Sequence, residues 1–255
     1  MNKDRYKIGK VYITATNPKD AKKRITEAAL SGKGGYVCVS NLRMIRYAGG
    51  HPDYAELMGD SLMNFPDGKP LMWCARLWGI KKVETTNGPA FFKEMLSNGS
   101  KSLKHYLLGD TQDVLNMILE KNNSEYHANI VGAEALPFAA VDEFDYKGIS
   151  ERIKESGANV VWTAMRAPKQ DEFNQRLSVI LPNVVSLGVG RAFRLLVGEV
   201  KDAPGWAHKA GVAGIFTRKV SLRRALAWYF GSAFYLMGYI AQICWRRYSG
   251  RMHYE

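Results

Sequence analysis

The chain contains few cysteines, and neither its thiols nor its histidines have the spacing of a metal site. Its 255 residues include three scattered cysteines, too few and too far apart for a disulfide framework. The five histidines are equally dispersed, whereas a structural zinc site needs ligands at short, regular separations. We therefore expect a reducing compartment and no metal on these side chains, which are Cys38, Cys74, Cys244, His51, His105, His127, His208 and His253.

The chain also lacks a complete glycine fingerprint for a dinucleotide. Gly188-Val189-Gly190 has no third glycine at the required spacing, and no fingerprint is followed by an acidic residue about 20 residues later. This absence argues against an oxidoreductase with a nucleotide cofactor. The segment instead predicts a tight strand-to-loop turn, where a glycine lets the backbone approach a ligand.

The amino-terminal residues lack the apolar stretch of a secretory signal. Residues 1–7 read Met-Asn-Lys-Asp-Arg-Tyr-Lys and are strongly charged. We therefore expect the protein to remain inside the cell.

Positive charge is in excess and unevenly distributed. The chain has 36 Lys and Arg against 24 Asp and Glu, a formal net charge of +12. Residues 201–255 contain nine of the cations and two of the acids, so this segment alone contributes +7. Such a balance indicates an anionic partner, for which nucleic acid, anionic lipid and a nucleotide diphosphate are the candidates.

An uncharged segment lies within this basic region. Residues 225–245 contain no charged side chain, and arginine pairs bracket them at 223–224 and 246–247. A helix of 21 residues is long enough to cross a bilayer. However, the segment is rich in Trp and Tyr, which prefer the headgroup level. We therefore favour a helix that lies in the membrane interface, with a true span or a helix buried in a core or oligomer as alternatives. A nucleic-acid-binding surface would instead spread its charge over a polar face.

Strands alternate with helices over most of the remaining chain, which predicts an α/β fold with a mostly parallel sheet. We expect strands at residues 35–40, 102–109, 127–132, 158–164 and 184–190. Ligands bind beyond the carboxyl ends of such strands, so that edge should gather Asn41, Gly109, Gly132, Ala167-Pro168 and Gly190. We assign residues 1–200 to this domain and residues 201–255 to a basic, apolar helical appendage.

Four segments together resemble the WecG/TagA/CpsF family of bacterial glycosyltransferases (glycosyltransferase family 26). Their order and spacing, from about residue 35 to residue 220, carry the resemblance, because each segment alone is short. They are Val39-Ser40-Asn41 with Asn-Phe-Pro-Asp-Gly-Lys-Pro at 64–70, Leu-Leu-Gly-Asp at 107–110, Ala-Pro-Lys-Gln-Asp-Glu at 167–172, and Gly-Val-Gly-Arg-Ala-Phe at 188–193. The chain departs from the family pattern at Val39, near Thr85, and after Arg218.

The resemblance implies a Rossmann-like sheet with helices on both faces, and an inverting transfer in one displacement step. The donor would be a UDP-sugar and the acceptor a saccharide on a polyprenyl diphosphate, in synthesis of an exopolysaccharide, capsule or teichoic-acid-like polymer. It places the enzyme on the cytoplasmic face of the bacterial inner membrane, bound peripherally or inserted shallowly through its tail. A non-catalytic membrane adaptor is the main alternative, and a homo-oligomer stays open.

Asp67 is the candidate general base. The flanking Pro66 and Gly68 favour a turn that presents the carboxylate to a cleft, and a carboxylate with a reference pKa near 4 is ionised at neutral pH. The same tripeptide is common in surface turns, where aspartate binds its own backbone. The family resemblance favours the catalytic role.

The remaining candidates would bind donor or acceptor. Asn41 could donate to sugar hydroxyls or simply form a turn, and Gln170 would start a helix whose amides suit phosphate. Arg218 is the first candidate to neutralise the diphosphate, because a guanidinium grips phosphate oxygens in a fixed fork. Arg223 and Arg224 could equally bind lipid headgroups. These binding candidates are Asn41, Gln170, Gly190, Arg218, Arg223 and Arg224.

A metal on an Asp-x-Asp motif holds the diphosphate in many glycosyltransferases, and this chain has no such motif. The nearest acidic cluster, at residues 142–145, reads as a solvated loop. We therefore expect metal-independent chemistry without a cofactor, with arginines in the place of the metal.

Overall fold

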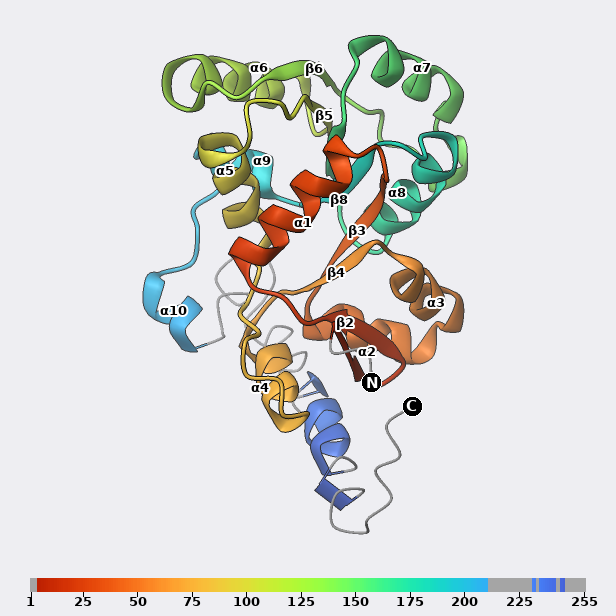
Figure 1. Ribbon diagram of the computed structural model, residues 1–255, viewed down its shortest axis with the longest axis vertical. Coiled ribbons are helices and arrows are strands. Elements are labelled where there is room, and N and C mark those ends of the chain that lie inside the picture. Colours follow the sequence, from red (N-terminus) through yellow and green to blue (C-terminus); the bar gives the residue numbers. More distant parts are fainter. Residues whose placement is uncertain (1–3, 211–230, 233, 242–243, 246–255) are drawn as a thin grey trace.

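The computed structural model describes residues 4–210, 231–232, 234–241 and 244–245 (Figure 1). Within them, six strands form one sheet in the order β4-β3-β8-β7-β5-β6, and every pair of neighbours is parallel. The expected α/β class with a parallel sheet is thereby confirmed. The strands are β3 (Gly35–Ser40), β4 (Met63–Pro66), β5 (His105–Gly109), β6 (Ile130–Glu134), β7 (Val160–Ala164) and β8 (Val185–Gly188).

The central strands are apolar on both faces, as a parallel sheet covered on both sides requires. All residues of β5 and β8 are buried, whereas those of the edge strand β6 are half-buried. Successive residues point to opposite faces, so Trp162 packs on one side of β7 and Val161 on the other. The sheet therefore separates two helical layers.

One layer packs around Trp162. Its ring lies edge-on to Phe92, with ring centroids 5.0 Å apart, and Phe92 contacts Phe193 at 5.2 Å. These large buried rings join the helices of this face into a single core. The elements of this layer are α1 (Pro18–Leu30), α5 (Gly88–Asn98), α6 (Gln112–Lys121), η1 (Asn122–Tyr126) and α9 (Ala192–Leu196).

The opposite layer packs on β3, β7 and β8, with α8 at its centre. A two-stranded antiparallel hairpin extends the fold beyond β4, where the Thr14 hydroxyl accepts a hydrogen bond from the Asn64 amide at 2.8 Å. The elements of the hairpin and of this layer are β1 (Arg5–Ile8), β2 (Val11–Thr14), α2 (Leu42–Gly50), α3 (Pro52–Asp60), α4 (Lys69–Leu77), η2 (Val141–Glu143), α7 (Tyr146–Ser156) and α8 (Lys169–Ile180). A short helix, α10 (Gly205–Ala210), follows the sheet in the chain.

One predicted strand end is wrong. Gly132 lies inside β6 and does not end it, so it does not join the other glycines at the carboxyl edge. A Cβ at this position would approach the Tyr106 ring within 2.3 Å. The glycine is therefore needed to make room for the tyrosine of the neighbouring strand. Glycine within a strand can mark such a close approach as well as a turn, and the sequence alone does not separate the two.

The described residues of the carboxyl-terminal tail (231–232, 234–241 and 244–245) are helical, and one side of them packs on the body beside α4 (Figure 1). Leu236 is 8% exposed, and the Tyr239 hydroxyl accepts a hydrogen bond from the Trp78 indole at 3.3 Å. The other side carries exposed apolar residues, among them Phe234 at 73% and Met237 at 54%. None of the helices in the described ranges is long and apolar enough to cross a membrane.

A buried histidine makes the fold sensitive to acid. His105 is 1% exposed, and its Nδ1 accepts a hydrogen bond from the Trp162 indole at 3.0 Å. Burial lowers the pKa of His105 to about 4. The unfolded chain takes up a proton near pH 6.5, whereas in the folded chain His105 stays neutral down to about pH 4. The folded state therefore becomes less stable as the pH falls from 6.5 to 4. We expect its contribution to the free energy of unfolding to fall by roughly 3 kcal/mol over that range.

Denaturant titrations of wild type and His105→Asn between pH 7 and 4 measure this contribution. The asparagine oxygen can replace Nδ1 as the acceptor, so the variant should show a smaller loss of stability towards acid. Equal pH slopes for the two proteins would contradict the assignment.

Candidate active site at the carboxyl edge of the sheet

Parallel pairing brings the ends of β3, β4 and β8 to one edge of the sheet. Ser40 pairs with Pro66 at the ends of β3 and β4, and Val37 pairs with Leu187 in β8. The loops that follow these strands begin with Asn41, Asp67 and residues 189–191. Three of the four sequence candidates that the structure describes therefore lie on adjacent strand ends.

Asp67 is held in place by backbone hydrogen bonds on both sides. Its amide donates to the Ser40 carbonyl at 2.7 Å, and the carbonyl of Pro66 accepts from the Thr86 amide at 2.8 Å. Gly68 follows with a φ of +103°, a conformation that favours glycine. The half-buried carboxylate thus sits on a turn that is tied to a neighbouring strand and to the segment before α5.

Asn41 caps the amino end of α2. Its Oδ1 accepts from the amides of Arg43 at 3.1 Å and Met44 at 3.2 Å, the usual role of asparagine at this position. The turn-forming interpretation is therefore satisfied by the amide oxygen. The amide nitrogen is still available as a donor at the carboxyl edge, so capping and ligand binding are compatible.

Gln170 lies at the start of α8, as expected, but it is only 4% exposed. Its Oε1 accepts from the Gly190 amide at 3.1 Å, and its side chain packs directly on Gly188. Gly190 has a φ of +59°, which glycine adopts without strain. Gln170 therefore connects the β7–α8 corner to the loop after β8.

The three arginine candidates, Arg218, Arg223 and Arg224, lie outside the described residues. Among the described cations, Arg194 lies at the same edge and binds Asp110 directly after β5. Its Nη2 is 2.6 Å from Oδ1, and its Nε is 3.0 Å from both carboxylate oxygens. The sequence pointed to the Gly109 turn but not to this pair, because its members are 84 residues apart.

A buried carboxyl next to Gln170 was also not anticipated. Asp171 is 2% exposed, and its Oδ2 accepts a hydrogen bond from the Tyr54 hydroxyl of α3. Burial raises the pKa of this carboxyl to about 7, although the Tyr54 hydrogen bond and the charge of Arg43 act in the opposite direction. No pattern in the sequence joins these residues, because they come from three helices.

Lys169 contacts the loop that follows β6. Its Nζ binds the carbonyl of Ala139 and lies over the rings of Phe144 and Phe138, at 4.8 and 5.4 Å from their centroids. Phe138 itself is fully exposed on the loop after β6. The lysine of the Pro-Lys-Gln segment therefore orders this loop through a cation–π contact.

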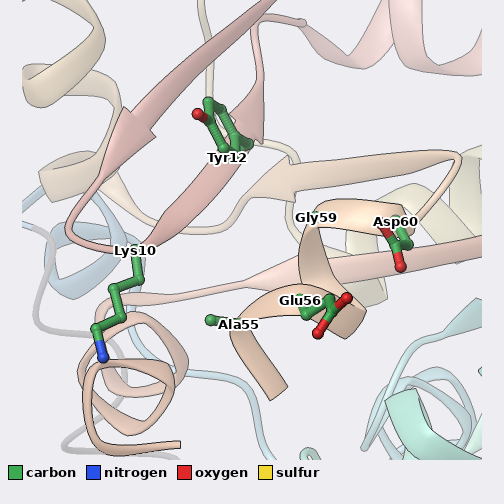
Figure 2. A pocket seen from close by; sticks show the side chains of 6 residues that line it. All are labelled: Lys10, Tyr12, Ala55, Glu56, Gly59 and Asp60. Carbon is green, nitrogen blue, oxygen red and sulfur yellow. The ribbon is translucent and has the colours of Figure 1, made fainter. Parts of the chain in front are cut away.

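Two surface hollows flank the hairpin. One, of about 300 Å³, lies between the β1–β2 turn and α3, and its lining includes Glu56 and Asp60 but none of the candidates (Figure 2). The second, of about 430 Å³, lies at the start of α1 and is lined by Asp20, Arg24 and Lys82 among others. In the part of the chain that the structure describes, no group of His, Cys, Asp and Glu could hold a metal ion.

The packing of Gln170 leads to a prediction at Gly188. A Cβ there would lie 2.8 Å from the side-chain amide of Gln170, so Gly188→Ala should displace that amide from Gly190. We expect a loss of about 1–3 kcal/mol in the free energy of unfolding, measured by denaturant titration. Gly59→Ala is the control, because nothing lies within 4 Å of its added Cβ. A variant at 188 as stable as wild type would contradict this packing.

The chain is similar to known glycosyltransferases. The chain is 27% identical over 155 residues to the N-acetylglucosaminyldiphosphoundecaprenol N-acetyl-beta-D-mannosaminyltransferase of Bacillus subtilis (strain 168). That match covers 60% of this chain and 59% of the relative. The model of the glycosyl transferase WecG/TagA/CpsF family matches residues 6–249, which is nearly the whole length. The chain therefore belongs to the WecG/TagA/CpsF family of glycosyltransferases.

Proposed function

We propose that the chain is an inverting, metal-independent glycosyltransferase. It moves one sugar from a UDP-sugar to a saccharide on a polyprenyl diphosphate, in the synthesis of a cell-surface polysaccharide. The observation that carries the proposal is the Asp67 turn at the carboxyl edge of a parallel sheet, the edge where ligands bind in this architecture. The name of the Bacillus relative supports the acceptor class, because its acceptor is an undecaprenol-linked N-acetylglucosaminyl diphosphate.

The reaction needs one proton transfer and one displacement. The Asp67 carboxylate accepts the proton of the acceptor hydroxyl as that oxygen attacks the anomeric carbon of the donor sugar. The bond between this carbon and the diphosphate oxygen breaks, and UDP leaves with the electron pair. Attack on the face opposite the leaving group inverts the configuration of the anomeric carbon.

The other candidates divide between the two ends of the donor. Asn41 follows the strand next to the one that ends before Asp67, and in this proposal its amide nitrogen donates to sugar hydroxyls. Gly190 and Gln170 shape the backbone turn after β8, where the nucleotide can approach closely. Arg218, Arg223 and Arg224 neutralise the charge that develops on the departing diphosphate.

Asp67→Asn tests the assigned base. The amide keeps the shape of the carboxylate but cannot accept the proton, so the rate of transfer should fall by roughly a hundredfold or more. The assay uses detergent-solubilised protein, a panel of UDP-sugars and a lipid-diphosphate-sugar acceptor. Asp60→Asn, an exposed aspartate away from the strand ends, serves as the matched control.

The outcomes separate the possible errors. If Asp67→Asn is as active as wild type, a different residue is the base. If wild type uses no donor in the panel, the transferase assignment fails and the membrane adaptor becomes the better interpretation.

We also propose that the appendage, residues 201–255, holds the enzyme on the cytoplasmic face of the bacterial inner membrane. Its basic charge suits anionic lipid, and the described helix presents an apolar side that the body leaves uncovered. This side includes Phe234 and Met237, whereas Leu236 anchors the opposite side. The helix would thus lie on the surface with one side on the protein and the other in the headgroup layer.

Phe234→Ser tests the membrane contact. Phe234 is 73% exposed, so the substitution should leave folding unchanged but weaken binding to phosphatidylglycerol vesicles by roughly tenfold. Co-sedimentation measures the bound fraction. Val179→Ser, which removes an apolar side chain that is 78% exposed on α8, should bind like wild type. Equal binding by all three proteins would contradict the assigned surface.

A further inference from the structure

A buried polar group lies behind the candidate site, on the side of the sheet that faces α2 and α3. It consists of Asp171 in the first turn of α8, Tyr54 on α3 and Arg43 in the first turn of α2. Asp171 is 2% exposed and Tyr54 is 5% exposed. A carboxyl group in such a place costs free energy unless it is hydrogen-bonded, so its presence calls for a physical reason.

Two connections join α8 to the helices that follow β3. The Tyr54 hydroxyl donates to Asp171 Oδ2, and the Arg43 Nη2 donates to the Ala167 carbonyl at 3.3 Å. Ala167 precedes the cis-proline at the corner between β7 and α8. The start of α8 is therefore fixed by two side-chain hydrogen bonds, one from Tyr54 to its first turn and one from Arg43 to the corner before it.

The same helical turn also reaches the candidate site. Gln170, next to Asp171 in the chain, accepts from the Gly190 amide and packs on Gly188. Asp171 and Gln170 thus share one turn, and the first contacts Tyr54 of the buried group while the second contacts the loop after β8. A shift of this turn would move both contacts together.

The turn that carries Asp67 does not depend on these contacts. It is held by the Ser40 carbonyl at the end of β3 and by the Thr86 amide in the segment before α5. The proton-accepting group and the nucleotide-side loop are therefore supported by separate sets of hydrogen bonds. Disturbing one set should leave the other in place.

We propose that Asp171 and Tyr54 are positioning residues for the nucleotide end of the donor site, acting through Gln170 on the Gly190 loop. The hydrogen bond between them sets the position of the first turn of α8, which sets the position of the backbone that meets the nucleotide. This inference rests on the proposed function in that it assigns the nucleotide to the loop after β8. Neither side chain contacts the reacting atoms.

Tyr54→Phe removes one oxygen and tests the proposal without emptying the site. We expect UDP to bind roughly tenfold more weakly by isothermal titration calorimetry. The KM for the UDP-sugar should rise by a similar factor, whereas kcat and the KM for the lipid acceptor change less than about twofold. Asp171→Ala should have a larger effect, and Asp171→Asn, which keeps an acceptor for Tyr54, should recover part of the affinity.

Tyr106→Phe provides the matched control. Tyr106 is also 5% exposed, and its hydroxyl donates to Glu134 at 3.1 Å between β5 and β6. The Tyr106→Phe variant should bind UDP like wild type, even if it is destabilised as much as the Tyr54→Phe variant. A purely structural role for the Tyr54 hydroxyl predicts equal behaviour of the two variants and would overturn the proposal.

The remaining outcomes keep the two proposals distinguishable. If wild type binds UDP but transfers no sugar, the transferase assignment fails and the UDP affinities still decide the role of Tyr54. If Tyr54→Phe lowers kcat and raises both KM values equally, the group supports the whole site and not its nucleotide end. A wild-type protein that binds no UDP would overturn both.

Discussion

The parallel pairing of β3 with β4 on one side and β8 on the other is the constraint on which the site depends. Parallel strands end at the same edge, so three loops that are far apart in the sequence begin side by side. The hydrogen bond from the Asp67 amide to the Ser40 carbonyl extends this pairing one residue beyond the strand. The turn that carries Asp67 is therefore a continuation of the sheet and inherits its rigidity.

Buried polar residues on either side of the sheet follow the same requirement for partners. Oδ2 of Asp171 accepts a hydrogen bond from Tyr54 on one layer, and Asp110 binds the fork of Arg194 at the end of β5. Both carboxylates sit next to a loop of the candidate site, and each ties that loop to a second element. Side chains that were not identified as candidates thus form the contacts between these loops and the rest of the fold.

The tail shows how one apolar segment can serve two surroundings. Leu236 and Tyr239 pack against the body near Trp78, whereas Phe234 and Met237 stay exposed. A helix that is apolar on all sides must have each side buried. Here the body of the protein buries only one side. The uncovered side is what the proposed membrane contact would bury.

The alternation of strands and helices determined the α/β class by itself, because hydrophobic runs bounded by glycine need no tertiary information to be recognised. The order of motifs also singled out Asp67 and Gln170. The hairpin and β4 were not anticipated, since strands of four residues carry little periodic signal. β8 is equally short, but the glycines at its end made it recognisable. The prediction that Gly132 ends a strand was wrong, because the glycine is needed to leave room for the ring of Tyr106 on the neighbouring strand.

Only the tertiary structure decided what each candidate contacts. The side-chain oxygen of Asn41 caps α2, and the side-chain oxygen of Gln170 accepts a hydrogen bond from the Gly190 amide. The partners Tyr54 and Asp171 are separated by 117 positions, as Asp110 and Arg194 are by 84. A pattern along the chain specifies local conformation and burial, whereas such pairs exist only because the sheet order brings distant segments together.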